Sequence, residues 1–452
     1  MELYTLVFDI GKTNKKCLLF DEQFIVQDKV ETHLPEITDE DGFPCEDIDL
    51  LSKWILDTFD HFHQKHGAKI GFVNFSTYGA SFVHLDEKGR VISPLYNYLK
   101  PVRDNYFDDF YKKYHGKDYF SKRTASPALD FLNSGLQLLW IKQEKPAVFN
   151  RIKSSLHLPN YCGCLFHKKA YSEYTSIGCH TALWDYEKMD YHEWVKKEGI
   201  LPLLPVITEG TRYLDMKYAG SNLRVGVGLH DSSAALIPYL FGVKERFILI
   251  STGTWSITLN PFSKDILTSE ELNRDSLQFL RVNGQQVKAA RLFLGNEFAL
   301  QIEKLNKYFK KGKDYFKTIR FQEEKFITFV NTGTKIFHFE SLGEKSKGNN
   351  QILSCFNSFD EAYYQLNYEL VLRQLDAYYL AKGTTEDIQT VFIDGGFSNN
   401  EVFCSIFARK LPDISLKKTQ LAAGSSLGVA IIMRPELFTQ RRFEEILGVE
   451  VI

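Results

Sequence analysis

The sequence predicts an α/β protein built from two similar halves, and three observations support this prediction. With 452 residues, the chain is too long for one ordinary core, so two or three domains are expected. Apolar, β-rich runs alternate with stretches that carry apolar residues at helical spacing. A strand, a polar tip with glycine and a second strand occur near the N-terminus, and this pattern returns in the second half.

Composition excludes several classes of protein. The chain is 44% hydrophobic and 25% charged, which is typical of a globular protein rather than a disordered or fibrous one. Its net charge of −2 provides no basic surface for nucleic acid or an anionic membrane. No segment approaches the ~20 apolar residues of a membrane span, and the N-terminus lacks the features of a signal peptide. We therefore expect no nucleic-acid partner and no membrane insertion.

The seven cysteines are odd in number and scattered, so they predict no disulfide framework. We expect a reducing, cytoplasmic location. Cys162-Gly-Cys164 lacks the two intervening residues of the usual metal and redox motifs, and no second pair completes a site. We interpret this pair as structural.

The first hairpin runs from Leu3 to Phe20, and its tip is Asp9-Ile-Gly11-Lys12-Thr13-Asn14. Backbone amides, a threonine hydroxyl and nearby lysines suit such a tip to phosphate oxygens. The alternative is a plain surface hairpin. A Walker A loop is excluded, because Leu6 stands where its first glycine is required and a strand, not a helix, follows.

Residues 48–66 predict a packed helix, and residues 70–75 predict a buried strand. The strand exits through Ser76-Thr77-Tyr78-Gly79-Ala80-Ser81, small polar residues of the kind that bind ligands at strand ends, although an ordinary turn is the alternative. The loop 94–104 includes Arg103 and several other groups that donate hydrogen bonds to hydroxyls. The stretch 201–210 is the best candidate for a linker.

Near the middle of the chain, Val225-Gly-Val-Gly-Leu-His230-Asp231-Ser232 precedes a run of small residues. Two glycines let a backbone approach a ligand closely, and the carboxylate that follows would enter a cleft. The alternative is a turn into a helix with Asp231 as its N-cap.

The second half repeats the hairpin, with strands at 247–250 and 255–259 around Ser251-Thr252-Gly253-Thr254. A third strand, 391–394, ends in Gly395 and Gly396 before a helix at 402–410, a geometry that can receive a nucleotide closely. Residues 360–381 predict a packed helix. We expect exposed helices and loops over 261–350, without chemistry, including the lysine-rich stretch 304–317.

Gly424-Ser425-Ser426-Leu427-Gly428 matches the nucleophile elbow of hydrolases. That interpretation fails because no Asp or His follows Ser426 to complete the triad in the order of that fold. Small residues that pack the last helix, 421–433, explain the motif better.

Together these motifs make the chain resemble the FGGY family of carbohydrate kinases, in the family's order and approximate spacing. The resemblance covers nearly the whole chain and is carried by Asp9-Ile-Gly-Lys-Thr-Asn14, Gly228-Leu-His-Asp-Ser232, Ser251-Thr-Gly-Thr254 and Asp394-Gly-Gly-Phe-Ser-Asn399. It implies two ribonuclease-H-like (actin-like ATPase) domains, 1–224 on the sugar and phosphate side and 225–452 on the nucleotide side, flanking a cleft for nucleotide and sugar. The rhamnulokinase-like branch is most similar, although that branch has Trp-Gly-Val-Asp where this chain has Tyr78-Gly79-Ala80-Ser81.

The resemblance further implies ATP-dependent phosphorylation of a terminal hydroxyl of a small sugar, such as the ketoses L-rhamnulose or L-fuculose. Asp231 would be the general base, and Asp9 would help to place Mg²⁺, directly or through water. The residues expected around ATP are Asp9, Lys12, Thr13, Asn14, Lys16, Gly253, Thr254, Gly395, Gly396 and Asn399. Those expected around the sugar are Tyr78, Gly79, Ser81, Arg103, His230, Asp231 and Ser232.

Three alternatives stay open at this point. The substrate could be a pentulose, xylulose or ribulose. The fold could serve a regulator that binds sugar or nucleotide without turnover, or an actin-like or Hsp70-like ATPase that acts on proteins. A monomer or a homodimer is expected.

Overall fold

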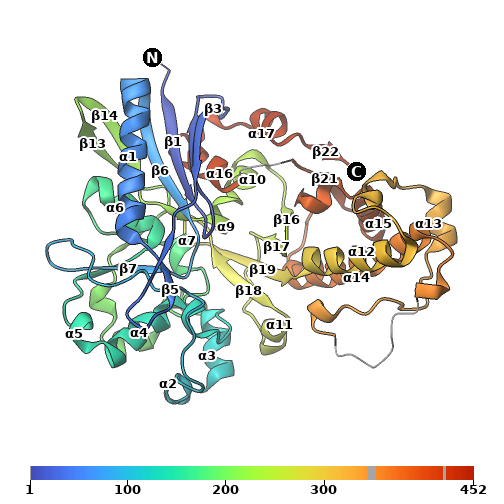
Figure 1. Ribbon diagram of the computed structural model, residues 1–452, viewed down its shortest axis with the longest axis horizontal. Coiled ribbons are helices and arrows are strands. Elements are labelled where there is room, and N and C mark those ends of the chain that lie inside the picture. The colour runs from blue at the N-terminus through green and yellow to red at the C-terminus, as the bar shows by residue number, and fades with distance from the viewer. Residues whose placement is uncertain (1, 345–352, 421–423) are drawn as a thin grey trace.

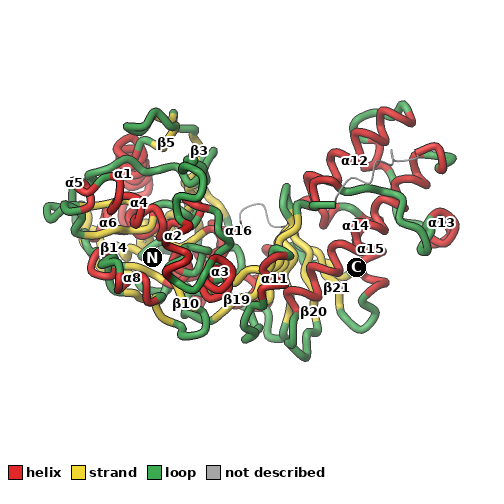
Figure 2. Tube along the Cα trace, turned by 90° about the horizontal axis from the view of Figure 1, so that it is seen from below, coloured by secondary structure: helices red, strands yellow, loops and turns green. Residues whose placement is uncertain are grey.

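The computed structural model describes residues 2–344, 353–420 and 424–452, which form two lobes (Figure 1). The first lobe, at the left of Figure 1, contains β1, β6 and α1, and the second, at the right, contains α12, α14 and α15. Seen from below, the lobes meet along α16 and β19 (Figure 2). Within the described residues, each lobe is built on a seven-stranded sheet.

The first sheet has the order β13-β14-β6-β1-β2-β3, with β15 also paired to β6. Strands β1, β2 and β3 form an antiparallel meander, and β6 runs parallel to β1 and to β14. The strands are β1 (Tyr4–Ile10), β2 (Lys15–Phe20), β3 (Val26–Thr32), β6 (Ile70–Thr77), β13 (Tyr213–Tyr218), β14 (Ser221–Gly226) and β15 (Leu229–His230).

The second sheet has the order β18-β19-β17-β16-β20-β21-β22. Strands β16, β17 and β19 repeat the antiparallel meander, and β20 and β21 repeat the parallel pairing of β6 and β14. The repeated hairpin of the sequence therefore marks a repeated sheet. The strands are β16 (Phe247–Thr252), β17 (Ser256–Asn260), β18 (Ser276–Leu280), β19 (Gln286–Leu292), β20 (Thr390–Gly395), β21 (Ser415–Lys418) and β22 (Glu450–Val451).

Helices cover both sheets, and short strand pairs complete the first lobe. The α-helices up to residue 242 are α1 (Ile48–His66), α2 (Asp108–Lys113), α3 (Lys117–Thr124), α4 (Ser134–Glu144), α5 (Pro146–Phe149), α6 (Leu158–His167), α7 (Tyr174–Ile177), α8 (Glu193–Lys197), α9 (Asp231–Ala234) and α10 (Ile237–Gly242). Those that follow are α11 (Ser269–Asn273), α12 (Leu294–Phe309), α13 (Glu323–Phe329), α14 (Phe359–Lys382), α15 (Glu401–Lys410), α16 (Gly424–Met433) and α17 (Gln440–Leu447). The short strands are β4 (Glu36–Thr38), β5 (Pro44–Glu46), β7 (Phe82–Leu85), β8 (Ser154–His157), β9 (Ser172–Glu173), β10 (Trp184–Asp185), β11 (Asp190–Tyr191) and β12 (Ile207–Thr208).

The strongest patterns of the sequence give the elements they predict. Both glycine-tipped hairpins form, as β1–β2 and β16–β17. The predicted helices appear as α1, α14 and α15, and the strand ending in paired glycines is β20. The predicted helix 421–433 is α16 from Gly424 onward, and residues 421–423 lie outside the described residues.

Two expectations are wrong. Residues 261–350 are not only exposed helices and loops, because β18 and β19 are central to the second sheet and mostly buried. Buried polar side chains interrupt the apolar pattern by which these strands could have been predicted. They are tolerated because the Gln278 amide donates to the Asp265 carbonyl and the Lys288 ammonium pairs with Asp265 and Glu271. The stretch 201–210 is no linker between lobes, since β13 and β14 follow it in the first sheet.

The lobes share a continuous apolar core. Val7 and Leu18 of the first sheet, Leu249 of the second and Val429 of α16 belong to one buried cluster. Helix α16, near the C-terminal end of the chain, packs on β1 and β6 of the first sheet. The last part of the chain therefore ties the two lobes together. None of the helices within the described residues combines the length and apolar character that a bilayer crossing requires.

Candidate active site

Asp231 lies at the junction of the lobes, as the first residue of α9. Strand β15 sets its position, because His230 pairs with Thr77 at the end of β6. Its side chain is 36% exposed, and one carboxylate oxygen accepts hydrogen bonds from the Ser232 amide at 2.6 Å and hydroxyl at 3.2 Å. Asp231 is not the N-cap, a position that belongs to His230. One oxygen is thus held by the chain while the carboxylate stays accessible.

The two glycines before Asp231 serve packing rather than ligand approach. A Cβ on Gly226 would lie 2.2 Å from the Asn74 side chain, and one on Gly228 would lie 2.1 Å from the Pro159 carbonyl oxygen. The Asn74 amide oxygen accepts from the Gly228 amide at 3.0 Å. The glycines therefore bring β14 and β15 tightly onto β6 and α6, and this contact fixes the start of α9.

His230 is buried beside Asp231 and forms one wall of the site. Its Nε2 lies 3.2 Å from Asp231 and 3.1 Å from the Cys179 sulfur, and its backbone amide donates to the Thr175 hydroxyl at 3.0 Å. Burial lowers the pKa of His230, while the Asp231 carboxylate opposes that shift. Gly79 completes this wall, because a Cβ there would lie 2.9 Å from the Cys179 sulfur. The neutral imidazole can donate to Asp231 or to a hydroxyl, but not to both at once.

Asp9 contacts α16, the helix at the junction of the lobes. Its carboxylate accepts hydrogen bonds from the hydroxyls of Ser425, at 3.1 Å, and Ser426, at 2.9 Å, on α16. Lys16 is its partner in the β1–β2 register. Burial raises the pKa of Asp9, the bond to Ser426 lowers it, and the negative charge of Asp231 raises it further. The two acids therefore share one electrostatic environment.

Ser425 and Ser426 were missed as site residues by sequence reasoning. The packing interpretation of their motif is supported, since a Cβ on Gly428 would lie 1.9 Å from the Ala234 carbonyl oxygen. That close contact is what brings the two serines to Asp9. The signal available in the sequence was the pair of adjacent hydroxyls in a helix otherwise rich in apolar residues.

The tip of the first hairpin is held from below by a buried ion pair. Lys15 pairs with Glu46, and the side chains are 3% and 4% exposed. The same ammonium donates to the carbonyls of Gly11, at 3.2 Å, and Lys12, at 3.1 Å. The Tyr78 hydroxyl donates to Glu46 at 2.5 Å. Tyr78 is therefore a support of the tip in this structure, rather than a residue that presents its hydroxyl to the cleft.

The other predicted residues of this tip differ in what they contact. Thr13 is exposed. The Lys12 ammonium pairs with Glu36 at 2.5 Å, and the Asn14 amide donates to Glu31. Lys12 and Asn14 are thus engaged by the first lobe, whereas Thr13 is free to meet a ligand.

The second tip opens onto the largest pocket described, of about 880 Å³. Gly253, Gly396 and Asn399, three of the residues predicted for ATP, line this pocket, whereas Gly395 and Thr254 do not. It also contains residues from the segment to which the sequence assigned no chemistry, Lys317 and Arg320. The remaining walls are Gly295, Phe298, Phe316, Ile319, Tyr363, Phe397, Ser398, Asn400, Glu401, Cys404, Ser405, Lys418, Glu450, Val451 and Ile452.

Gly395 shapes the second tip from behind. Its φ is +82°, and a Cβ there would lie 1.8 Å from the Thr252 carbonyl oxygen. The Thr252 hydroxyl donates to the Asp394 carbonyl at 2.5 Å and accepts from the Phe397 amide at 3.0 Å. Gly395 is therefore required by the backbone, and Gly396 forms the pocket wall.

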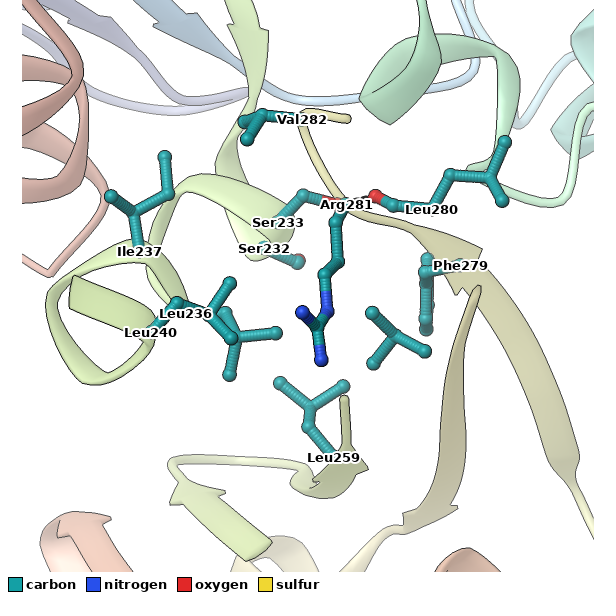
Figure 3. Close-up of a pocket in the computed structure, with 11 residues that line it drawn as sticks. Ser232, Ser233, Leu236, Ile237, Leu240, Leu259, Phe279, Leu280, Arg281 and Val282 are labelled. Atoms are coloured by element: carbon teal, nitrogen blue, oxygen red, sulfur yellow. Dashed lines mark hydrogen bonds between the residues drawn. The ribbon is translucent and has the colours of Figure 1, made fainter. Parts of the chain in front are cut away.

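The remaining predicted sugar residues lie in different places. Ser232 lines a small pocket of about 10 Å³ beside α9 (Figure 3). Ser81 is buried, and its carbonyl accepts from the Leu158 amide at 3.2 Å. Arg103 is exposed and stacks on the Tyr106 ring at 4.9 Å. No contact of Arg103 with the residues around Asp231 is present among the described residues.

A magnesium ion bound through phosphates needs one or two protein carboxylates. Within residues 2–344, 353–420 and 424–452, no group of three or more His, Cys, Asp and Glu side chains could hold a metal alone. Asp9 is a partly accessible carboxylate beside a second acid. It therefore fits a magnesium site completed by phosphates, and not a site made of protein ligands alone.

Known proteins share this architecture. Residues 4–212 match the model of the "FGGY family of carbohydrate kinases, N-terminal domain". The chain is 24% identical over 268 residues to a rhamnulokinase of Halalkalibacterium halodurans, covering 56% of this chain and 55% of that protein. It is 22% identical over 207 residues to a gluconokinase of Bacillus subtilis, covering 45% of this chain and 39% of that protein. The chain thus spans about half the length, or less, of these relatives.

The fold is shared over a longer stretch. The crystal structure of a carbohydrate kinase from Novosphingobium aromaticivorans superposes with a TM-score of 0.78 at 22% identity, covering 95% of this chain and 93% of that one. The two-domain, actin-like α/β fold predicted from the motifs is confirmed. Residues 4–212 are therefore similar to the N-terminal domain of the FGGY family of carbohydrate kinases, in agreement with the resemblance noted in the motifs.

Proposed function

We propose that the protein is an ATP-dependent carbohydrate kinase that transfers a phosphoryl group to a terminal hydroxyl of a small sugar. The observation that carries this proposal is the placement of Asp231. Its accessible carboxylate stands at the junction of the lobes, within electrostatic reach of Asp9 in the first hairpin. A pure binding protein needs no such base.

In this proposal, Asp231 accepts the proton of the attacking sugar hydroxyl, a contribution typically worth ~10²–10⁴ in rate. The hydrogen bonds from Ser232 hold the carboxylate in place, and His230 is positioned to orient a neighbouring hydroxyl. Burial keeps His230 neutral, so the imidazole does not neutralise the base.

Phosphoryl transfer otherwise requires alignment and neutralisation of charge. Thr13 on one tip and Thr254 on the other would donate to the phosphates, and exposed Gly253 would let them approach the second tip closely. Asp9, with Ser425 and Ser426 fixing one oxygen, would hold Mg²⁺ directly or through water. The ion, when bound with ATP, supplies positive charge at the phosphate oxygens.

The nucleoside would occupy the pocket of about 880 Å³, a volume within the range of small-molecule sites. Gly396 leaves that wall open, since no atom lies within 4 Å of a Cβ built there. This arrangement supports a sugar side in the first lobe and a nucleotide side in the second, as expected for 1–224 and 225–452, although β14 and β15 extend the sheet of the first lobe to His230. Closure of the lobes on the sugar would exclude water and limit ATP hydrolysis.

The substrate class we propose is a ketose such as L-rhamnulose or L-fuculose, with a pentulose, xylulose or ribulose, as the second candidate. The rhamnulokinase relative supports the first choice, and the gluconokinase relative shows that the likeness alone does not select one sugar. One or two side chains decide among similar ketoses. We further propose a cytoplasmic protein, monomeric or homodimeric.

The test is ADP release with Mg-ATP and a panel of L-rhamnulose, L-fuculose, L- and D-ribulose, D- and L-xylulose and glycerol, with the mass of the phosphorylated product as a second readout. Strong dependence on one ketose is expected. If ATP binds and no sugar stimulates ADP release, the protein is a binding regulator and the kinase proposal is withdrawn. ADP release that is independent of every sugar would point instead to an ATPase.

A further inference from the structure

Arg281 is a cation embedded among apolar side chains. It follows β18, and Figure 3 shows its side chain running between the α9–α10 segment and the sheet toward Leu259. Its guanidinium donates to the Pro261 carbonyl and, at 2.9 Å, to the Gln285 side chain, and it lies 5.2 Å from the centre of the Phe262 ring. Neutral groups are thus its partners.

The positive charge of the Arg281 guanidinium is partly removed from water without an opposite charge beside it. Burial lowers the pKa of Arg281 to about 10, and no carboxylate contributes to that shift. Within the part of the chain that the structure describes, no ion pair is formed by this guanidinium. A charge removed from water without an opposite charge costs several kcal/mol, so an anion that reached Arg281 would be bound favourably.

The guanidinium also borders a second, open hollow of about 510 Å³, which we name the basic hollow. Three cations line it, Arg246, Lys264 and Arg281. Its acidic lining residue, Glu187, is engaged by Arg123. The other lining residues are Tyr186, Met189, Pro261, Phe262, Ser263, Ile266, Gln285 and Gln286. The hollow therefore combines an excess of positive charge with apolar lining residues such as Phe262 and Ile266.

Strand β18 connects the basic hollow to the active site through consecutive residues. The Gln278 carbonyl accepts from the Tyr186 hydroxyl at 2.9 Å, and Tyr186 lines the hollow. The Phe279 ring stacks on His230, with centroids 6.2 Å apart. The Leu280 carbonyl accepts from the Ser233 hydroxyl at 3.4 Å, on the helix that carries Asp231. A shift of Arg281 would thus be felt at both His230 and α9.

We propose that the basic hollow binds a small phosphate ester and that its occupancy is transmitted along β18 to His230 and α9. Arginine forks match the oxygens of a phosphate, and the volume suits a compound of sugar-phosphate size. Phe262 and Ile266 would contact the organic part. This site lies outside the machinery of the proposed kinase reaction and does not depend on it.

The test measures binding of D-ribose 5-phosphate to the full chain by calorimetry, without ATP and sugar. Arg281→Met should weaken binding more than about tenfold, and Lys264→Ala about three- to tenfold, since each removes a cation from the anion. Lys304→Ala, on the exposed face of α12, is the matched control and should change nothing. Because the Arg281 charge is unpaired, Arg281→Met should keep or raise the unfolding temperature.

Two further measurements, and the binding assay itself, can overturn the proposal. Saturating ATP should not displace the ester, so displacement would assign the binding to the active site and overturn the proposal. Inorganic phosphate or citrate that bound as tightly as the ester would contradict the ligand class. The proposed site would be contradicted if the ester did not bind at millimolar concentration, or if all three variants bound it equally well.

Transmission is read by hydrogen exchange, which needs no catalytic activity. Bound ester should slow amide exchange in residues 276–282 and 229–234 together. Slower exchange in 276–282 alone would support the binding site but contradict its coupling to α9. Loss of kinase activity in the sugar panel would affect neither result.

Discussion

The two hairpin tips look alike in sequence and are held in different ways. The first tip, 11–14, rests on the buried Lys15–Glu46 pair, with the ammonium donating to two tip carbonyls. The second tip, 252–255, rests on close backbone contacts with Gly295 and Gly395. Charge fixes one tip and the absence of side chains fixes the other. A shared function at the tips therefore does not require a shared means of support.

The largest expected effect comes from breaking the first support. Lys15→Met leaves the Glu46 carboxylate buried without its partner, which should lower the free energy of unfolding by about 3–5 kcal/mol. Thermal or urea unfolding measures the loss. Lys12→Met is the matched control, because the Lys12–Glu36 pair on the same tip is exposed and should be worth less than about 1 kcal/mol. Equal losses in both variants would contradict the role of the buried pair.

The second support should be broken by one methyl group. Gly395→Ala places a Cβ against the Thr252 carbonyl oxygen at a φ of +82°. We expect a loss of roughly 2–3 kcal/mol and weaker ATP binding, from strain and overlap. Gly396→Ala is the control, since its added Cβ meets no atom within 4 Å. If Gly396→Ala proved the more damaging for stability, the backbone account of this tip would be wrong.

The stability of the first lobe should be more sensitive to acid than that of the second. The histidines whose pKa values are lowered by burial lie in the first lobe, at or before His230 on β15, and His84 and His157 are lowered to about 3. The unfolded chain takes up protons near pH 6.5 while the folded chain does not, so their stabilising contribution is complete above pH 6.5 and is lost as the pH falls. Each costs about 1.4 kcal/mol per pH unit below 6.5.

The measurement is the unfolding temperature at pH 7, 6 and 5, with hydrogen exchange to locate the opening. The first lobe should open first on acidification, and His84→Leu should flatten the slope. His61→Leu, at an exposed position of α1, is the control. Initial opening of the second lobe would count against this difference.

The smallest effect concerns the hydroxyls that the tips present. Thr13→Ala and Thr254→Ala should each raise the KM for ATP by about two- to tenfold, the net value of a typical hydrogen bond. The KM for the sugar should change little. A kinetic titration of both substrates checks this, and the reverse pattern would place these residues on the sugar side.

The sequence predicted the repeated parts of the fold well, because strand–tip–strand patterns and amphipathic helices are local. It failed for β18 and β19, whose buried Gln278 and Lys288 are satisfied by partners distant in the chain. Partners distant in the chain also explain why only part of the candidate site could be predicted. Asp231 could be identified from its motif, but Ser425 and Ser426 reach Asp9 only through the packing of α16 on α9. Contacts across more than 400 residues leave no local pattern.

The most direct test of the account compares wild type with Asp231→Asn for turnover and for ATP affinity, with the ketose that gives the strongest ADP release. The account predicts that kcat falls by ~10²–10⁴ while ATP still binds with nearly unchanged affinity. Asp215→Asn, an exposed carboxylate of β13, serves as the control and should keep wild-type turnover. Near-normal turnover in Asp231→Asn would contradict the central claim and remove Asp231 from the role of base.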